Sequence, residues 1–441
     1  MPRPMEITTP FDGDTLLFHR MRAREELSRV SEYHLELLSE EVDLNSDDIL
    51  GQNVTVTVEL PDQQQRYFNG FVTRFSQQGT HGRYHRYCAV VRPWLWFLSR
   101  TADCRIFQEM TVPDILKQVF AEHGTADFSF ELTGSYRTWN YCVQYRESDL
   151  DFVSRLAEHE GIYYYFRHTA EHHTLVLTDS SSQHVAAPNL DALPFIAPNQ
   201  QARAESQHIS SWEFARQVQP GAYIHDSYDL ERPSVDLQAK KTVARSYSLS
   251  EGEVYDWSGA YEEKADGEQY ADVRINELAT QFETADAETT ARGVTVGCSL
   301  ALEDHPRDDQ NQEYLVLATN YDMKCGEYEG LPSEEATTCQ CDFVMLSTKQ
   351  QFRPQRLTTK PFVQGPQTAV VVGPSGDEIY TDEYGRVKCQ FHWDRLGKQD
   401  ENSSCWIRVS HPWAGKGWGA VATPRIGQEV IVSFLEGDPD R

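Results

Sequence analysis

The stretch GRVKCQFHWD, residues 385–394, alternates apolar and polar side chains and decides the fold of the region around it. Four apolar residues fall on one face of an extended chain, namely Val387, Cys389, Phe391 and Trp393. Four polar residues fall on the other face, namely Arg386, Lys388, Gln390 and His392. A period of two predicts a β-strand with one buried face.

The segments CWIRVS (405–410) and EVIVSF (429–434) repeat this alternation more briefly. Turns rich in Gly, Pro and Asp separate the segments. Short strands of this kind, closely spaced along the chain, predict a small β-barrel such as an OB-fold.

Upstream, the chain is also dominated by strand patterns. The segment NVTVTVEL (53–60) alternates valine with threonine, and the run from Arg66 to Ser99 reads as two long strands around a turn at 79–82. A polar hairpin joins strands at 162–166 and 174–179. Three amphipathic helices are predicted at 111–124, 148–161 and 266–283. The predicted fold is mainly β with inserted helices (α+β).

The charge balance disfavours nucleic acids and anionic membranes as free partners. Lys and Arg total 40 against 68 Asp and Glu, so the formal net charge is −28, and the summed field repels phosphates. The nine cysteines form no CxxC pair, which is typical of a reducing compartment. The N-terminus has no apolar signal-peptide core, and no segment approaches 18 apolar residues, so we expect a cytoplasmic product without a transmembrane segment.

Two stretches carry a specific family resemblance. The run YTDEYGRVKCQFHWDR…SSCWIRV…WAG…PRIGQEVIVSFLEGDPDR (380–441) and the run VQYRESDLDFVSRLAEHEGIYYYFRHTAEHHTLVLTD (143–179) resemble the VgrG spikes of type VI secretion systems. The resemblance implies a phage-tail-hub-like region over 1–370, with two barrel-like β-subdomains and helical insertions. It implies an OB-fold over 371–441 that is incomplete at its C-terminus, cut before the family's β-helical needle.

The resemblance also implies a function and partners. VgrG proteins are non-enzymatic, homotrimeric, membrane-puncturing spikes at the tip of the hexameric Hcp tube. They are sharpened by a PAAR-repeat protein, they carry effectors, and they are secreted without a signal peptide. A baseplate hub of a prophage is the alternative within the same fold.

The residues point to no catalytic, cofactor-binding or metal site. Glu158, His159 and Glu160 resemble part of an HExxH zinc motif, but Gly161 follows and a second histidine is missing, which favours a helix end. We expect a solvated hairpin tip for His168, His172 and His173. We expect packing rather than ligation for the pair Cys339 and Cys341.

Nucleic-acid binding by the OB-fold is the sharper alternative. Between 385 and 425, seven basic residues oppose three acidic ones, and five aromatic residues are interleaved. The alternation in 385–394, however, predicts that Phe391 and Trp393 are core residues. We therefore assign the outward-facing residues to an assembly face, with Trp406, Arg408, Trp413 and Arg425 as candidates.

Overall fold

The computed structural model describes residues 3–187, 190–197, 207–326 and 337–441. They form two compact units. Unit 1 comprises Met1–Trp96, Thr125–Gly134 and Ala157–Arg356, and unit 2 comprises Phe97–Gly124, Ser135–Leu156 and Leu357–Arg441.

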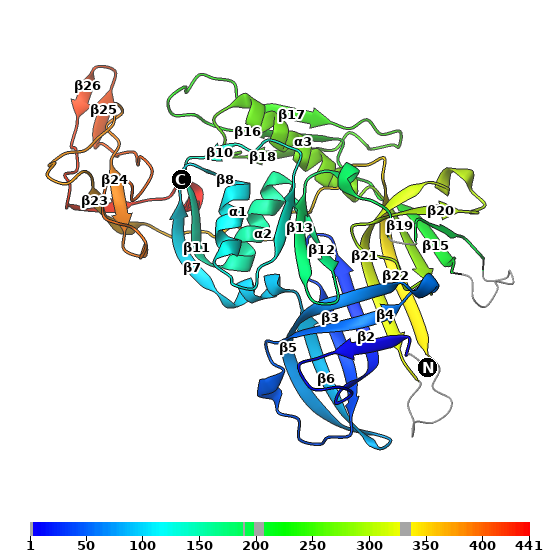
Figure 1. Ribbon diagram of the computed structural model, residues 1–441. Coiled ribbons are helices and arrows are strands. Elements are labelled where there is room, and N and C mark those ends of the chain that lie inside the picture. Colours follow the sequence, from blue (N-terminus) through cyan, green and yellow to red (C-terminus); the bar gives the residue numbers. More distant parts are fainter. Residues whose placement is uncertain (1–2, 188–189, 198–206, 327–336) are drawn as a thin grey trace. The chain divides into compact units, whose positions relative to one another are not determined.

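Unit 1 is built on a large mixed sheet, to which the described residues contribute twelve strands (Figure 1). Ten of them follow the hydrogen-bonded order β1-β4-β5-β6-β3-β2-β21-β22-β19-β15, while β20 pairs with β21 and β14 pairs with β20. The first group of bounds is β1 Met5–Thr8, β2 Leu17–Glu26, β3 Glu32–Ser39, β4 Asn53–Glu59, β5 Gln65–His81 and β6 Tyr84–Arg92. The second group is β14 Ala192–Pro194, β15 Ile209–Arg216, β19 Glu283–Thr289, β20 Ser299–Glu303, β21 Glu313–Lys324 and β22 Thr338–Ser347.

The antiparallel pair of β2 and β21 joins an N-terminal half of this sheet to a half formed after residue 190. Its register runs from Arg20 opposite Lys324 to Glu26 opposite Ala318. Within the described residues, the hydrogen-bonded path ends at β1 and β15 and does not close on itself. The predicted mainly β fold with inserted helices is confirmed, whereas the division of residues 1–370 into two barrel-like subdomains stays a prediction.

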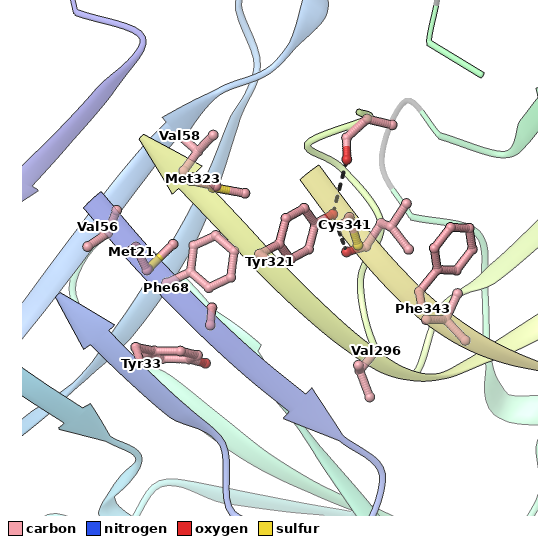
Figure 2. Close-up of a cluster of buried hydrophobic side chains, with 14 of the residues drawn as sticks. Met21, Tyr33, Val56, Val58, Phe68, Val296, Tyr321, Met323, Cys341 and Phe343 are labelled. Atoms are coloured by element: carbon pink, nitrogen blue, oxygen red, sulfur yellow. Dashed lines mark hydrogen bonds between the residues drawn. The ribbon is translucent and has the colours of Figure 1, made fainter. Parts of the chain in front are cut away.

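The core of unit 1 receives side chains from both halves of the sheet (Figure 2). Phe68 lies edge-on to Tyr33 and to Tyr321, with ring centroids 5.5 and 6.1 Å apart. The Tyr321 hydroxyl donates to the carbonyl oxygens of Ala291 and Val294 at 3.2 and 3.0 Å, so its polar tip is satisfied inside the core.

A buried ion pair lies beside these rings and was not predicted from the sequence. Arg66 Nη2 donates to Glu25 Oε2 at 2.7 Å, and the Tyr33 hydroxyl donates to Glu25 Oε1 at 2.9 Å. Burial raises the pKa of Glu25, but hydrogen bonding to His168 and the charge of Arg66 outweigh it and bring this pKa down to about 2. The carboxylate is therefore ionised within the core.

The hairpin of β12 (Tyr163–His168) and β13 (His173–Thr178) forms where it was expected. Two of its histidines, however, do not lie where the sequence predicted. The expected solvated tip is wrong for His168 and His173, because the side chain of His168 is 7% exposed and His173 is 3% exposed. The second strand of the hairpin, β13, is the central strand of a three-stranded sheet and pairs in parallel with β9 (Phe128–Glu131). The hairpin tip is short, so both strand ends carry their histidines into the protein, toward Glu25 and Asn69.

A small sheet on helix α3 (Lys264–Thr280) was also not predicted. Its strands, in the order β17-β16-β18, are β17 Ala239–Thr242, β16 Ala222–Asp226 and β18 Glu253–Trp257. Tyr223 and Ala239 of the sheet pack against Ala271 and Ile275 of α3. These strands are too short for a period of two to be visible in the sequence.

Helices α1 (Val112–Ala121) and α2 (Asp149–Glu160) begin at the caps that the sequence predicts. The Asp114 amide donates to Thr111 Oγ1 at 3.3 Å, and the Asp151 amide donates to Ser148 Oγ at 3.1 Å. Gly161, with φ of +75°, ends α2 in the left-handed conformation. The Glu158–Glu160 segment is thus a helix end, as expected.

Unit 2 contains α1, the start of α2, two small antiparallel pairs and the C-terminal module (Figure 1). The pairs are β7 (Ala102–Phe107) with β11 (Cys142–Ser148), and β8 (Met110–Thr111) with β10 (Thr138–Trp139). The module contains β23 (Gln367–Val372) between β24 (Lys388–Phe391) and β27 (Glu429–Val432), and a hairpin of β25 (Trp413–Gly415) with β26 (Trp418–Ala420).

Two strand predictions need correction. The second strand of the first long pair ends at Arg92, because Pro93 lacks the amide hydrogen that would continue the ladder, and residues Trp94–Arg100 form a 3₁₀-helix. The segment 405–410 forms only an isolated bridge between Ile407 and Val387.

Candidate assembly surface

The closing module places its apolar alternation inside, as the sequence predicts. Val387, Cys389 and Phe391 are at most 3% exposed and pack with Ala369, Val371 and Val432. Trp393 is half-buried against this cluster, and its indole nitrogen donates to Gln367 Oε1 at 2.8 Å. Large aromatic side chains of this stretch are therefore used for packing, which removes them from the solvent-facing surface.

Trp406 and Arg408 lie outside this core, on the segment whose Ile407 and Val409 pack into it. The Trp406 ring contacts Tyr380, with ring centroids 4.9 Å apart, and Lys388 Nζ lies 5.1 Å from the Trp406 centroid. Trp406 is half-buried by these neighbours, whereas Arg408 is exposed.

Arg425 is also exposed, and it forms an ion pair with Glu378. Because Glu378 and Tyr380 belong to one short segment, the structure brings Arg425 and Trp406 to the same stretch of chain. Trp413 belongs to the β25–β26 hairpin instead, where its ring meets that of Trp418 edge-on at 5.1 Å. Trp413 and Trp418 are 66% and 57% exposed.

Further exposed apolar side chains of the module were missed. Val421, Ile431 and Leu396 are 78%, 76% and 62% exposed. The signal for Ile431 was present, because Val430 and Val432 on either side of it face the core and the residue between them must face outward. Isolated exposed apolar residues are ordinary, but several together on one small module are typical of an interface.

Unit 1 contains a polar pocket. It has a volume of about 500 Å³ and is lined by Arg20, Glu288, Asp322, Lys324 and Cys339, among others. Arg20 Nε donates to Asp322 Oδ1 at 2.9 Å, so these two charges compensate each other. Burial raises the pKa of Cys339 to about 11, which leaves a neutral thiol rather than an activated nucleophile.

In residues 3–187, 190–197, 207–326 and 337–441, no group of three or more His, Cys, Asp or Glu side chains is placed to hold a metal ion. None of the helices in these ranges is long and apolar enough to cross a bilayer.

Comparisons with known proteins agree with this architecture. Residues 24–326 match the family of the phage tail baseplate hub (GPD), and residues 368–441 match the type VI secretion system/phage-baseplate injector OB domain. Among solved structures, a type VI secretion system component of E. coli, described as similar in structure to the T4 bacteriophage tail proteins gp27 and gp5, shares the fold with a TM-score of 0.68. Its sequence identity is 18%, over 100% of this chain and 96% of that chain.

Curated relatives are closer in sequence. The type VI secretion system spike proteins VgrG1b and VgrG1a of Pseudomonas aeruginosa are 47% and 46% identical over 100% of this chain, which spans 59% and 68% of their lengths. The actin cross-linking toxin VgrG1 of Vibrio cholerae is 34% identical over 93% of this chain and 37% of its own length. Both regions of the chain and its full-length similarity lead to one assignment: it belongs to the VgrG family of type VI secretion system spike proteins.

Proposed function

We propose that this chain forms the trunk of a trimeric, cell-puncturing spike of a type VI secretion system. Family membership over the whole chain carries the proposal. The exposed apolar residues of the OB module support it, because Trp413, Trp418, Val421 and Ile431 offer the side chains that a second and third copy would bury. Trp406, Arg408, Trp413 and Arg425 remain the candidates for this assembly face.

The partners follow from the same proposal. Three copies, each contributing two halves of the unit 1 sheet, would present six similar surfaces to the hexameric Hcp tube. A PAAR-repeat protein would sharpen the tip, and effectors would travel with the spike. The chain would be made in the cytoplasm and exported by the type VI apparatus.

We further propose that the segment 1–370 acts as the hub and 371–441 as the OB-fold, with no enzymatic activity in either. The neutral thiol of Cys339 and the paired charges around it support the absence of catalysis in the one pocket described above. The toxin name of one relative belongs to a protein of which this chain covers 37%.

The oligomeric state tests the proposal. Analytical ultracentrifugation of the chain over a wide concentration range is expected to show a trimer that a double substitution, Trp413→Ala with Ile431→Asp, dissociates. Val185→Asp is the matched control, because Val185 is 72% exposed but belongs to unit 1. A chain that stays monomeric up to submillimolar concentration contradicts the proposal.

The nucleic-acid alternative has lost its main support. Phe391 is 3% exposed, so it cannot stack on a base. Retention of the chain on single-stranded DNA that decreases with added salt would revive this alternative.

A further inference from the structure

The segment Gly437–Arg441, which reads GDPDR, makes a dense set of contacts with a stretch of chain about 80 residues upstream in the sequence. Lys360 Nζ lies 2.6 Å from Asp438 Oδ1 and 2.6 Å from Asp440 Oδ2. The Val363 amide donates to the Gly437 carbonyl oxygen at 2.8 Å. One ammonium group thus lies within ion-pair distance of two carboxylates that are two residues apart.

Gly437 fits this arrangement for a steric reason. Its φ is +70°, and a Cβ added to it would lie 2.2 Å from Cε2 of Phe362. The Phe362 ring therefore occupies the space that a side chain would need. The segment 360–363 and the segment 437–440 are matched by shape as well as by charge.

Asp440 extends the contact to a third part of the chain. Its Oδ1 accepts a hydrogen bond from the Val143 amide of β11 at 2.7 Å, and the C-terminus lies beside β11 in Figure 1. The Val143 carbonyl oxygen in turn accepts from Arg155 Nη2 at 2.9 Å, and Arg155 is held by Glu147 at 2.8 Å. The Asp440 side chain is 6% exposed, and its Oδ1 accepts this hydrogen bond while its Oδ2 faces the Lys360 ammonium as an ion pair.

We infer that the GDPDR segment is a carboxylate clamp, which fastens the linker 357–363 and the β7–β11 pair to the strands of the OB module. Lys360, Gly437, Asp438 and Asp440 are its positioning residues. The clamp makes the helical insertion and the OB module one mechanical body within unit 2. Transmission of thrust through this body is the part of the inference that rests on the proposed function.

Two neighbouring contacts show why the clamp is needed. Arg395 Nη2 donates to Asp103 Oδ2 at 2.6 Å, and Gln108 Nε2 donates to the Asn402 carbonyl oxygen at 2.7 Å. Both also connect the OB module to β7 or its vicinity, but both are exposed. Exposed pairs of this kind contribute little to stability, because water competes for and screens them. The most buried of these groups is the Asp440 carboxylate, which lies between the half-exposed Lys360 ammonium and the Val143 amide.

Hydrogen exchange measured by mass spectrometry or NMR on the full chain tests the clamp. In Lys360→Met and in Asp440→Asn, exchange of the Val143 and Val363 amides is expected to accelerate roughly 10- to 100-fold, because a charge-assisted contact no longer holds the segments together. Amides of the β12–β13 ladder in unit 1 are the internal reference and are expected to keep their rates.

The matched control is Arg395→Met, which breaks the exposed pair between the same two regions and is expected to change both rates less than twofold. Asp438→Asn is the milder variant should Lys360→Met unfold unit 2. Rates for Val143 and Val363 within twofold of wild type in all three clamp variants overturn the inference. That outcome leaves the spike proposal standing, whereas a monomeric chain removes the spike proposal and leaves the clamp.

Discussion

Among single residues, His173 shows how one buried side chain is fixed in one protonation state. The Trp94 amide donates to its Nε2 at 2.9 Å, and its Nδ1 lies 2.7 Å from Asn69 Oδ1. Nε2 is thus the acceptor and Nδ1–H the donor, so the ring is neutral. Burial, together with neighbouring His168 and His172, lowers the pKa of His173 to about 3.

This histidine predicts a loss of stability in mild acid. In the unfolded chain His173 binds a proton with its ordinary pKa of 6.5, whereas in the folded chain it stays neutral at that pH. The contribution of the neutral ring to the free energy of unfolding is therefore complete above pH 6.5 and decreases toward pH 3. Urea unfolding of the wild type and of His173→Gln at several pH values measures it. The difference between them is expected to shrink by on the order of 2 kcal/mol between pH 7 and pH 5. Parallel curves would contradict this assignment.

The buried Glu25–Arg66 pair supplies a second residue-level prediction. Glu25→Gln leaves the Arg66 charge buried without its partner and is expected to lower the free energy of unfolding by about 3 kcal/mol at pH 7. Glu26→Gln is the control, since it removes the adjacent carboxylate from a more exposed pair with Arg24 and is expected to cost about 0.5 kcal/mol or less. Chemical denaturation gives both values, and equal losses would show that burial is not the cause.

Among the elements, α2 shows how a helix end is completed by a side chain from another helix. Arg274 Nη2 donates to the carbonyl oxygens of Glu158 and His159 at 2.6 and 3.0 Å, which satisfies two groups that the last helical turn leaves open. Gly161 then turns the chain toward β12. Both contacts lie within unit 1.

Substitution of this glycine is expected to be costly. Gly161→Ala places a side chain at a φ of +75° and 2.6 Å from Val273 Cγ1, so we expect a loss of about 2 kcal/mol or more. Gly124→Ala, near the end of α1, is the control because a Cβ there meets nothing within 4 Å. Thermal unfolding of the two variants compares them, and a Gly161→Ala protein as stable as the control would refute the steric argument.

At the scale of the whole molecule, the OB module is completed by residues from far upstream. Ile106 of β7 packs against its core, and the Tyr145 hydroxyl accepts from Gln367 Nε2 at 2.8 Å. The family match to the OB domain begins at residue 368, and β23 runs across the proposed boundary at 370. Sequence similarity and physical packing thus divide the chain at different places.

A fragment comprising 371–441 is therefore expected to remain unfolded on its own. It lacks Ile106, the first four of the six residues of its central strand β23, and the lysine of the clamp. Narrow amide dispersion in a ¹H–¹⁵N NMR spectrum of the fragment is the expected result. A well-dispersed spectrum would show that the module folds independently of the upstream residues.

The sequence predicts those parts of the fold that local periodicity and capping decide. The alternation in 385–394 identified the core face of β24, and Thr111 and Gly161 marked helix ends. The depth of His168 and His173 could not be predicted, because it depends on β5 passing over the hairpin. The outward position of Trp406 was readable from alternation, but its contact with Tyr380 depends on a segment that has no periodic pattern.

The pairing of β2 with β21 also has a consequence for synthesis. Arg20 and Asp322 are 302 positions apart, so one edge of β2 has no strand to pair with until most of the chain has been made. At roughly 5–20 residues per second, that interval is about 15–60 s. During it the ribosome carries a nascent chain with an open strand edge of unpaired backbone groups, which is the condition that recruits holding chaperones and favours aggregation when expression is fast.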